Sequence, residues 1–374
     1  MLSNSKPKVS ILLSVYNHEK YVKKSIDSIL KQTYTNFELI ILDNGSTDRS
    51  GKIISEFKDK RIVFLQEKKN ITAYFGVQAC FEKAKGELIA FMGSDDLWEN
   101  TKLEKQVSFL EKNPEYGMVF TETDMIDAQG KTADWTPFFS AERNMSRYEW
   151  LRHFFFFSNC VCWPSCLMYK DLKEKTSYSD ARFLQLGDFN IWIKALTRSS
   201  LYIYPEVLTH YRQHGENESQ KNIDLLHNRS NLEITYIFQT YEKLSCEVLL
   251  AIFPELRNIH NFNETNKLYY LARISLDYYR DSPNYNARRM FGLQIIFSIY
   301  SRDDLAKNLE KSCHFGIRDF YTLTGLPIDI SYSKSSNHIN LLHSNRDLSD
   351  VRFKTLYKEI IKRFKWKTKS LLGC

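Results

Sequence analysis

The sequence predicts an α/β protein with a doubly wound, mostly parallel sheet, followed by a mainly helical C-terminal region. From Val9 to about Phe120, short β-rich runs alternate with segments of helical periodicity. The β-rich runs are apolar and largely uninterrupted, as expected of strands that are buried on both faces of a parallel sheet. Beyond Asn222 the pattern changes to long helical stretches, such as Leu268 to Tyr279. Strand–helix alternation at this spacing implies right-handed crossovers.

The first two predicted strands are Val9 to Leu13 and Phe37 to Leu42, and each is an apolar run. The helix between them has one apolar stripe, made of Val22, Ile26, Ile29 and Leu30. The second strand ends in Asp43-Asn44-Gly45-Ser46, and the turn and cap residues Ser46 to Asp48 precede the next helix. A strand, a helix and a further strand in this order form the repeating unit of a parallel sheet.

Two further strands complete the regular part of the pattern. Ile62 to Leu65 is the third strand and Leu88 to Met92 is the fourth. The helix between them runs up to the stop signal Lys85-Gly86. Between about residues 120 and 220 the pattern is less regular and includes a predicted helix from Phe189 to about Thr197.

Open α/β sheets bind their ligands at the carboxyl ends of the strands. This rule selects three loops that are rich in hydrogen-bonding side chains: Ser14 to Glu19, Asp43 to Asp48, and Gly93 to Trp98. In the third loop, Asp95 and Asp96 offer two carboxylates that suit Mg²⁺ or Mn²⁺, with positions left open for phosphate oxygens. Taken alone, this pair fits equally well a solvated acidic turn that caps the next helix.

Four spaced blocks of the sequence resemble the family 2 glycosyltransferases, which have the GT-A fold. The opening block comprises Val9 to Asn17 and Phe37 to Asp48; the others are Lys83 to Trp98, Leu186 to Trp192, and Tyr211 to Ser219. The resemblance covers roughly residues 7 to 220 in order. It implies a GT-A domain over residues 7–222, with a nucleotide-binding part (7–120) and an acceptor side (121–222). We expect a helical domain over 223–374.

The resemblance implies a binding site for a UDP-sugar. Ser14 and Tyr16 would hold the uracil and its ribose, because a tyrosine face can stack on a base and a hydroxyl can bond its edge. The expected nucleotide-binding residues are Ser14, Tyr16, Asn17, Glu19, Asp43, Asn44, Ser46 and Asp95. Asn44 stands where the family has a second acid, so its amide oxygen accepts without charge assistance.

The resemblance also implies a metal site for Mn²⁺ or Mg²⁺. Its expected ligands are Asp95, Asp96 and His214, and Arg212 is the candidate contact to the diphosphate. Many family members have a further aspartate where this chain has Gly93. The site therefore has one carboxylate ligand fewer. His214 is the best candidate to replace it, because a neutral imidazole is a competent ligand for Mn²⁺.

Asp188 matches the position of the family's catalytic base. Inversion at the anomeric carbon needs one in-line displacement, and an alcohol attacks well only if a carboxylate takes its proton. Gly187 stands where relatives often have another acid. A helix N-cap is the alternative role for Asp188, and the two roles are compatible.

These features predict an inverting, metal-dependent glycosyltransferase that builds a surface polysaccharide on a glycan or lipid-linked acceptor. A nucleotidyltransferase is an alternative, but a glycine-rich phosphate loop with a lysine is absent after the first strand, at Ser14 to Asn17. A nucleotide-sugar-binding scaffold with a degenerate catalytic site is the non-enzymatic alternative, to which Gly93 lends support.

The cellular location follows from charge and hydropathy. The start of the chain has no hydrophobic signal core and no apolar run is as long as a membrane span, so we expect a cytoplasmic protein. Residues 350–374 predict a basic amphipathic helix, which suits the anionic inner face of the membrane or, alternatively, packing on the domain with a solvated basic side. The net charge is +7, but the sequence contains no recognised nucleic-acid-binding module, so we expect no nucleic-acid partner.

Overall fold

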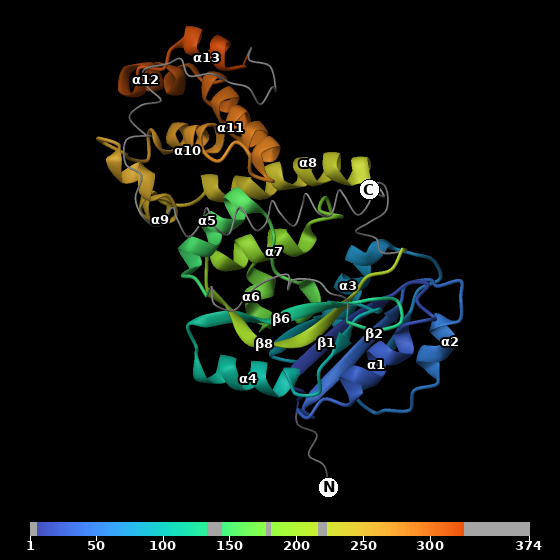
Figure 1. Cartoon of the computed structure of the whole chain (residues 1–374). Helices are drawn as coiled ribbons and strands as arrows, with labels where there is room; N and C mark the ends of the chain where they lie inside the picture. The colour runs from blue at the N-terminus through green and yellow to red at the C-terminus, as the bar shows by residue number, and fades with distance from the viewer. Residues whose placement is uncertain (1–5, 133–143, 177–180, 216–222, 325–374) are drawn as a thin grey trace. The chain divides into compact units, whose positions relative to one another are not determined.

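The computed structural model of the chain describes residues 6–132, 144–176, 181–215 and 223–324 (Figure 1). The chain divides into two compact units. The sheet unit comprises residues up to Leu151 together with Asn159–Glu233, and the helical unit comprises Arg152–Ser158 together with the chain from Ile234 onward. The expected domain boundary at 222/223 lies at the start of helix α8 (Ile223–Glu242), and the division at 233/234 lies within that helix.

The sheet unit contains one eight-stranded sheet with the order β3-β2-β1-β4-β7-β6-β8-β5. Its strands are β1 (Val9–Val15), β2 (Phe37–Asp43), β3 (Ile62–Gln66), β4 (Leu88–Met92), β5 (Leu97–Trp98), β6 (Tyr116–Ile126), β7 (Leu167–Tyr169) and β8 (Ser200–Arg212). The pairs β1–β2, β1–β4, β2–β3 and β6–β8 are parallel, and β4–β7, β6–β7 and β5–β8 are antiparallel. The predicted mostly parallel α/β sheet is confirmed.

The helices of the sheet unit alternate with its strands (Figure 1). They are α1 (Val22–Leu30), α2 (Ser50–Ser55), α3 (Thr72–Lys83), α4 (Lys102–Lys112), the start of α5 (Arg147–Phe157), α6 (Lys170–Lys175) and α7 (Gly187–Leu196). Every residue of β2 and β4 is buried, which explains why their sequences show no polar alternation. The four strands predicted between residues 9 and 92 lie where the apolar runs indicated.

Strand register brings three loops to one edge of the sheet. Val15 at the end of β1 pairs with Asp43 of β2, and Leu13 pairs with Met92 at the end of β4. Because the three strands are parallel, the loops that follow them leave from the same edge. The pairing of Leu97 with His210 then brings the end of β8 beside the loop after β4.

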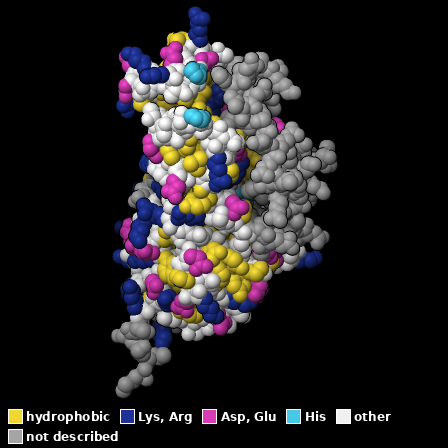
Figure 2. Space-filling model, turned by 90° about the vertical axis from the view of Figure 1, so that its left-hand side faces the viewer, with side chains coloured by type: hydrophobic (Ala, Val, Ile, Leu, Met, Phe, Trp, Pro, Cys, Tyr) yellow, Lys and Arg dark blue, Asp and Glu magenta, His cyan; other side chains and the backbone are white. Residues whose placement is uncertain are grey.

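The region that looked irregular in sequence contains the two longest strands, β6 with 11 residues and β8 with 13. Their pairing shifts register around Glu122, and Pro205 interrupts the alternation within β8. These irregularities mask the strand pattern in the sequence. On the α4 side, Phe109 stacks on Tyr202 of β8 with ring centroids 4.2 Å apart. Figure 2, drawn from that side, shows hydrophobic side chains gathered on its lower part.

The helical unit confirms the predicted helical C-terminal region. After α8 it contains α9 (Cys246–Ile252), a 3₁₀ turn (Pro254–Asn258), α10 (Lys267–Asp277), α11 (Tyr285–Tyr300), α12 (Asp303–Cys313) and α13 (Ile317–Thr324). The ring of Phe155 packs against Phe238, Tyr241 and Phe253, with centroids 4.7 to 5.1 Å apart. Among the described residues, no helix has the length and apolarity that crossing a membrane requires. The predicted basic helix at 350–374 lies outside the described residues.

Phe155→Ala should destabilise the helical unit by about 3–5 kcal/mol, because it removes a fully buried ring from the aromatic core. Urea unfolding followed by circular dichroism measures the change. Phe297→Ala is the matched control: this ring is 62% exposed, so its loss should change stability by no more than about 0.5 kcal/mol. Equal effects of the two substitutions would contradict this description of the core.

Candidate active site

The loops after β1 and β2 are held together by side chains that the sequence marked for nucleotide binding. Asn17, at a positive φ of 52°, donates its backbone N–H to Ser46 Oγ at 3.1 Å, and its Oδ1 accepts the Thr47 N–H at 2.8 Å. Glu19 Oε2 accepts the backbone N–H of Arg49 at 3.0 Å and its Nε at 3.1 Å. In this structure, Asn17, Glu19 and Ser46 therefore join the loop after β1 to the loop after β2.

Asp43 and Asn44 are buried at the end of β2. Asp43 accepts the Ser46 N–H at 3.0 Å and Gln66 Nε2 at 3.2 Å, each on a different carboxylate oxygen. Asn44 Oδ1 accepts the Ile71 N–H at 3.0 Å, which fastens the entrance of α3 to the sheet. A carboxylate oxygen has two lone pairs, so Asp43 retains capacity to accept a further N–H.

Tyr16 differs from these residues because its side chain is exposed. It is 39% accessible at the end of β1, where its ring face is available for stacking. Ser14 lies in β1, two residues before Tyr16, and is half-buried beneath α3. A Cβ added at Gly76 would lie 2.2 Å from Ser14 Oγ, so α3 approaches the strand this closely only because residue 76 is glycine.

Asp96 points into the protein. It is 2% exposed, and its Oδ1 accepts the backbone N–H of Arg212 at 2.8 Å. Burial, and then the neighbouring charge of Asp95, raises the pKa of Asp96 well above its usual range. A Cβ added at Gly93 would lie 2.2 Å from Asp96 Oδ2. Asp96 therefore fills the space that a side chain at position 93 would need.

Asp95 and His214 lie together, and His18 joins them. His214 Nε2 is 3.0 Å from Asp95 Oδ2, and one ligand atom from each of the three residues lies within 4.8 Å of the others. Tyr21 stacks on His214 with centroids 4.7 Å apart, and His18 Nδ1 lies 2.5 Å from Ser94 Oγ. The imidazole orientations are thus supported by neighbouring side chains.

This donor set fits a divalent transition-metal ion. Two imidazole nitrogens and one carboxylate oxygen suit Mn²⁺, whereas Mg²⁺ prefers oxygen ligands. Of the expected ligands, the structure brings Asp95 and His214 into the group and leaves Asp96 outside it. His18 was not among the expected ligands, although it lies in the first of the three loops selected from the sequence.

Arg212, expected at the diphosphate, is 1% exposed and donates to backbone carbonyls. Its Nε donates to Asp95 O at 2.6 Å and its Nη1 to Asp127 O at 2.8 Å. The guanidinium also lies over the Tyr21 ring, 5.2 Å from its centroid. These contacts join the end of β8 to the loops after β4 and β6, so in this structure Arg212 supports the backbone of Asp95.

Asp188 lies in the first turn of α7, and it is not the N-cap, which is Leu186. Its Oδ1 accepts the Phe189 N–H at 2.7 Å, and its Oδ2 accepts Asn159 Nδ2 at 3.0 Å. Burial raises the pKa of Asp188 to about 6. At neutral pH this carboxylate is ionised and more basic than an ordinary aspartate, as a general base requires.

The sequence matches a family model described as "Glycosyl transferase family 2" over residues 10–172. An uncharacterized glycosyltransferase of Methanocaldococcus jannaschii is 30% identical over 212 residues, which cover 55% of this chain and 71% of that protein. The chain belongs to the family 2 glycosyltransferases. The alternatives of a nucleotidyltransferase and a non-enzymatic scaffold gain no support from these similarities.

A second relative and a solved structure are also similar to this chain. An Escherichia coli protein named UDP-Glc:alpha-D-GlcNAc-diphosphoundecaprenol beta-1,3-glucosyltransferase is 25% identical over 262 residues, covering 68% of this chain and 97% of that protein. The crystal structure of S. aureus TarS 1-349 in complex with UDP-GlcNAc matches with a TM-score of 0.53 and 15% identity, covering 85% of this chain and 90% of that one. The structural match confirms the expected GT-A fold.

Two residues of the glycosyltransferase that support Asp188 had no signal in the sequence. Asn159 comes from a loop 29 positions earlier. Glu233, on α8, accepts the backbone N–H groups of the loop that leads into α7, those of Leu184, Gln185 and Leu186. Both contacts join segments that are distant in sequence, which no local pattern predicts. Among the described residues, a Cβ at Gly187 would meet only Tyr74, at 3.9 Å.

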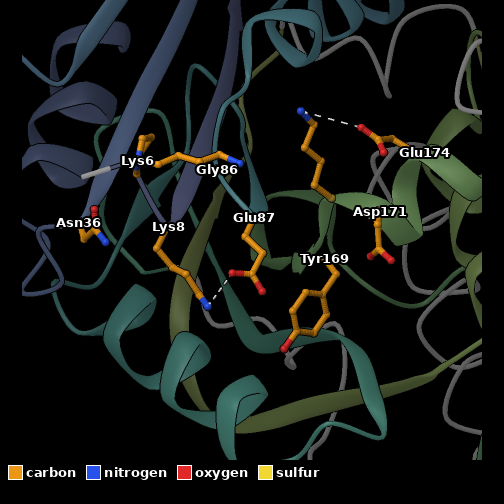
Figure 3. Close-up of a pocket in the computed structure, with 10 residues that line it drawn as sticks. Lys6, Lys8, Asn36, Gly86, Glu87, Tyr169, Asp171 and Glu174 are labelled. Carbon is orange, nitrogen blue, oxygen red and sulfur yellow. Dashed lines mark hydrogen bonds and ion pairs between the residues drawn. The ribbon is translucent and has the colours of Figure 1, made fainter. Parts of the chain in front are cut away.

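A separate cavity of about 540 Å³ lies at the opposite edge of the sheet (Figure 3). It is lined by Lys8 and Glu87, which directly precede β1 and β4, and by side chains around Tyr169. Two ion pairs lie among its lining residues: Lys8 Nζ is 2.9 Å from Glu87 Oε2, and Lys170 Nζ is 3.8 Å from Glu174 Oε1. Paired charges offer little attraction for a nucleotide diphosphate, so this cavity is not the candidate donor site.

His18→Ala should weaken Mn²⁺ binding by at least about tenfold, because one of three nitrogen or oxygen ligands is lost. Titration of Mn²⁺ followed by electron paramagnetic resonance measures the affinity without any substrate. His260→Ala, an exposed histidine of the helical unit, is the control and should leave the affinity unchanged. Undiminished binding by the His18 variant would remove that residue from the metal site.

Proposed function

We propose that the chain is an inverting, metal-dependent glycosyltransferase that moves a sugar from a UDP-sugar to an acceptor hydroxyl. The observation that supports this proposal is the grouping of His18, Asp95 and His214 in the loops that follow β1, β4 and β8. One ligand atom from each residue lies within 4.8 Å of the others, and His214 Nε2 is 3.0 Å from Asp95 Oδ2.

The loops after β1, β2, β4 and β8 offer groups for each part of a nucleotide diphosphate. Tyr16 presents a ring face for the base, and Asp43 has an oxygen that can accept a base N–H. A divalent ion bound by His18, Asp95 and His214 would neutralise the charge that develops on a departing diphosphate. Arg212 holds the Asp95 backbone in place for this role.

Asp188 is the group that takes the acceptor proton. In a single displacement, the acceptor oxygen bonds to the anomeric carbon as the bond to the diphosphate oxygen breaks, and the hydroxyl proton passes to Asp188. Oδ1 of Asp188 accepts the Phe189 N–H and Oδ2 accepts Asn159 Nδ2, and because each carboxylate oxygen has two lone pairs, capacity remains for the acceptor proton. The raised pKa of Asp188 favours this transfer.

The names of similar proteins support the substrate class. The Escherichia coli relative is named for a UDP-glucose donor and an undecaprenol-diphosphate-linked acceptor, and the TarS structure holds UDP-GlcNAc. We therefore infer a UDP-hexose or UDP-N-acetylhexosamine donor and a lipid-linked or glycan acceptor, in the synthesis of a surface polysaccharide. The basic sequence of residues 350–374 suits an enzyme that meets such an acceptor at an anionic membrane surface.

Asp188→Asn should keep UDP binding in the presence of Mn²⁺ but lose transfer, because an amide cannot take a proton. For the unmodified enzyme, kcat/KM should fall about tenfold for each pH unit below about 6, since protonated Asp188 is inactive as a base. Release of UDP from UDP-glucose or UDP-N-acetylglucosamine, with lipid-linked acceptors, measures both. Asp127→Asn is a control in a surface turn, where the carboxylate accepts only backbone N–H groups. Unchanged turnover in the Asp188 variant would exclude it as the base.

Deletion of residues 350–374 should abolish sedimentation with vesicles that contain anionic lipid. The deletion removes the basic segment while leaving every described residue in place. Vesicles of neutral lipid are the control and should bind neither protein. Equal sedimentation of the full and shortened chains with anionic vesicles would show that the segment is not the membrane contact.

A further inference from the structure

We propose that Asn159 is a positioning residue for the reaction, which holds the Asp188 carboxylate ionised and correctly turned. The proposal rests on the proposed role of Asp188 as the base. Asn159 Nδ2 donates to Asp188 Oδ2 at 3.0 Å. A hydrogen bond to a charged acceptor stabilises the charged form and opposes the effect of burial.

The orientation of the Asn159 amide is fixed by a second hydrogen bond. Its Oδ1 accepts the backbone N–H of Val161 at 3.2 Å, the arrangement of an Asx turn. Because the oxygen is used in this way, the NH₂ group must face Asp188. An NH₂ donor bonds more strongly to an ionised carboxylate than to the neutral acid, so this neighbour favours the ionised form of Asp188.

The segment that follows Asn159 is held by hydrogen bonds to β5 and α4. The Pro164 carbonyl accepts Trp98 Nε1 at 2.9 Å, and Gln106 Nε2 donates to the Ser165 carbonyl at 2.9 Å. Trp98 belongs to β5, directly after the loop of Asp95 and Asp96. The segment that follows Asn159 is thus joined to the strand directly after the loop of Asp95 and Asp96.

The other titratable groups near Asp188 do not supply this effect. Glu233 on α8 has the same sign of charge and raises the pKa of Asp188. The Cys162 thiol has a pKa raised well above its usual range by burial, so it is uncharged at neutral pH. Phe189 contributes a backbone N–H, which no side-chain substitution removes. Asn159 is thus the side chain whose removal should change the ionisation of Asp188 most directly.

Asn159→Leu tests the proposal, because leucine fills similar space without a donor. Loss of a hydrogen bond to a charged group should move the titration of Asp188 upward by about one pH unit. Asn159→Asp should move it further, since two carboxyl groups 3.0 Å apart cannot both ionise freely. The acid limb of kcat/KM should shift by the same amount, so that the loss of activity shrinks as pH rises.

The titration is measured directly by NMR of protein labelled with ¹³C at the aspartate carboxyl carbons. The Asp188 signal is assigned by its loss in Asp188→Asn. Asn113→Leu is the matched control: that amide also donates one hydrogen bond, to the Phe109 carbonyl at 2.8 Å, and its loss should leave the signal unmoved. An unmoved Asp188 titration in Asn159→Leu, or an activity loss that is the same at every pH, would overturn the proposal.

The two readouts separate this proposal from the role of Asp188 on which it rests. If Asp188→Asn retains full turnover, the proposed role of Asp188 as the base fails, whatever the NMR titration of the Asn159 variants shows. If Asp188→Asn is inactive but the Asn159 variants titrate as the unmodified enzyme does, only the positioning role of Asn159 fails.

Discussion

The structure depends on the parallel pairing of β1 with β2 on one side and with β4 on the other. Parallel strands begin at one edge and end at the other, so every loop that follows them is delivered to the same place. These strands are buried on both faces, and a register slip of one residue would exchange their two faces against the helices. The core therefore fixes the position of the polar loops, although those loops contribute little to it.

The second half of the sheet closes the site. β5 has only two residues, yet its pairing with β8 places His210 opposite Leu97 and the end of β8 beside Asp95 and Asp96. Two buried side chains then join the end of β8 to the loop after β4: Arg212 Nε donates to the Asp95 carbonyl, and the carboxylate of Asp96 accepts the Arg212 N–H. Burying a charged side chain without such partners would cost on the order of several kcal/mol. These hydrogen bonds explain how Asp96 and Arg212 can both be buried.

The sequence was sufficient for the regular half of the fold and for the loops of the site. Uninterrupted apolar runs predicted β1 to β4, and the strand-end rule selected the loops that contain Tyr16, Asp43 and Asp95. The direction in which each side chain points could not be predicted from the sequence. Whether Asp96 faces an ion or the interior depends on its contact with Arg212, which is 116 positions away. The contacts of Asn159 and Glu233 with the segment around Asp188 likewise depend on chain folding and leave no periodic trace in the sequence.

Gly93 leaves room for the inward rotamer of Asp96. The carboxylate of Asp96 occupies the volume that a side chain at residue 93 would enter, 2.2 Å from the ideal Cβ position. A side chain at residue 93 would therefore displace this carboxylate, whose other oxygen accepts the Arg212 N–H. The effects of substitutions at residues 93 and 96 should consequently be non-additive.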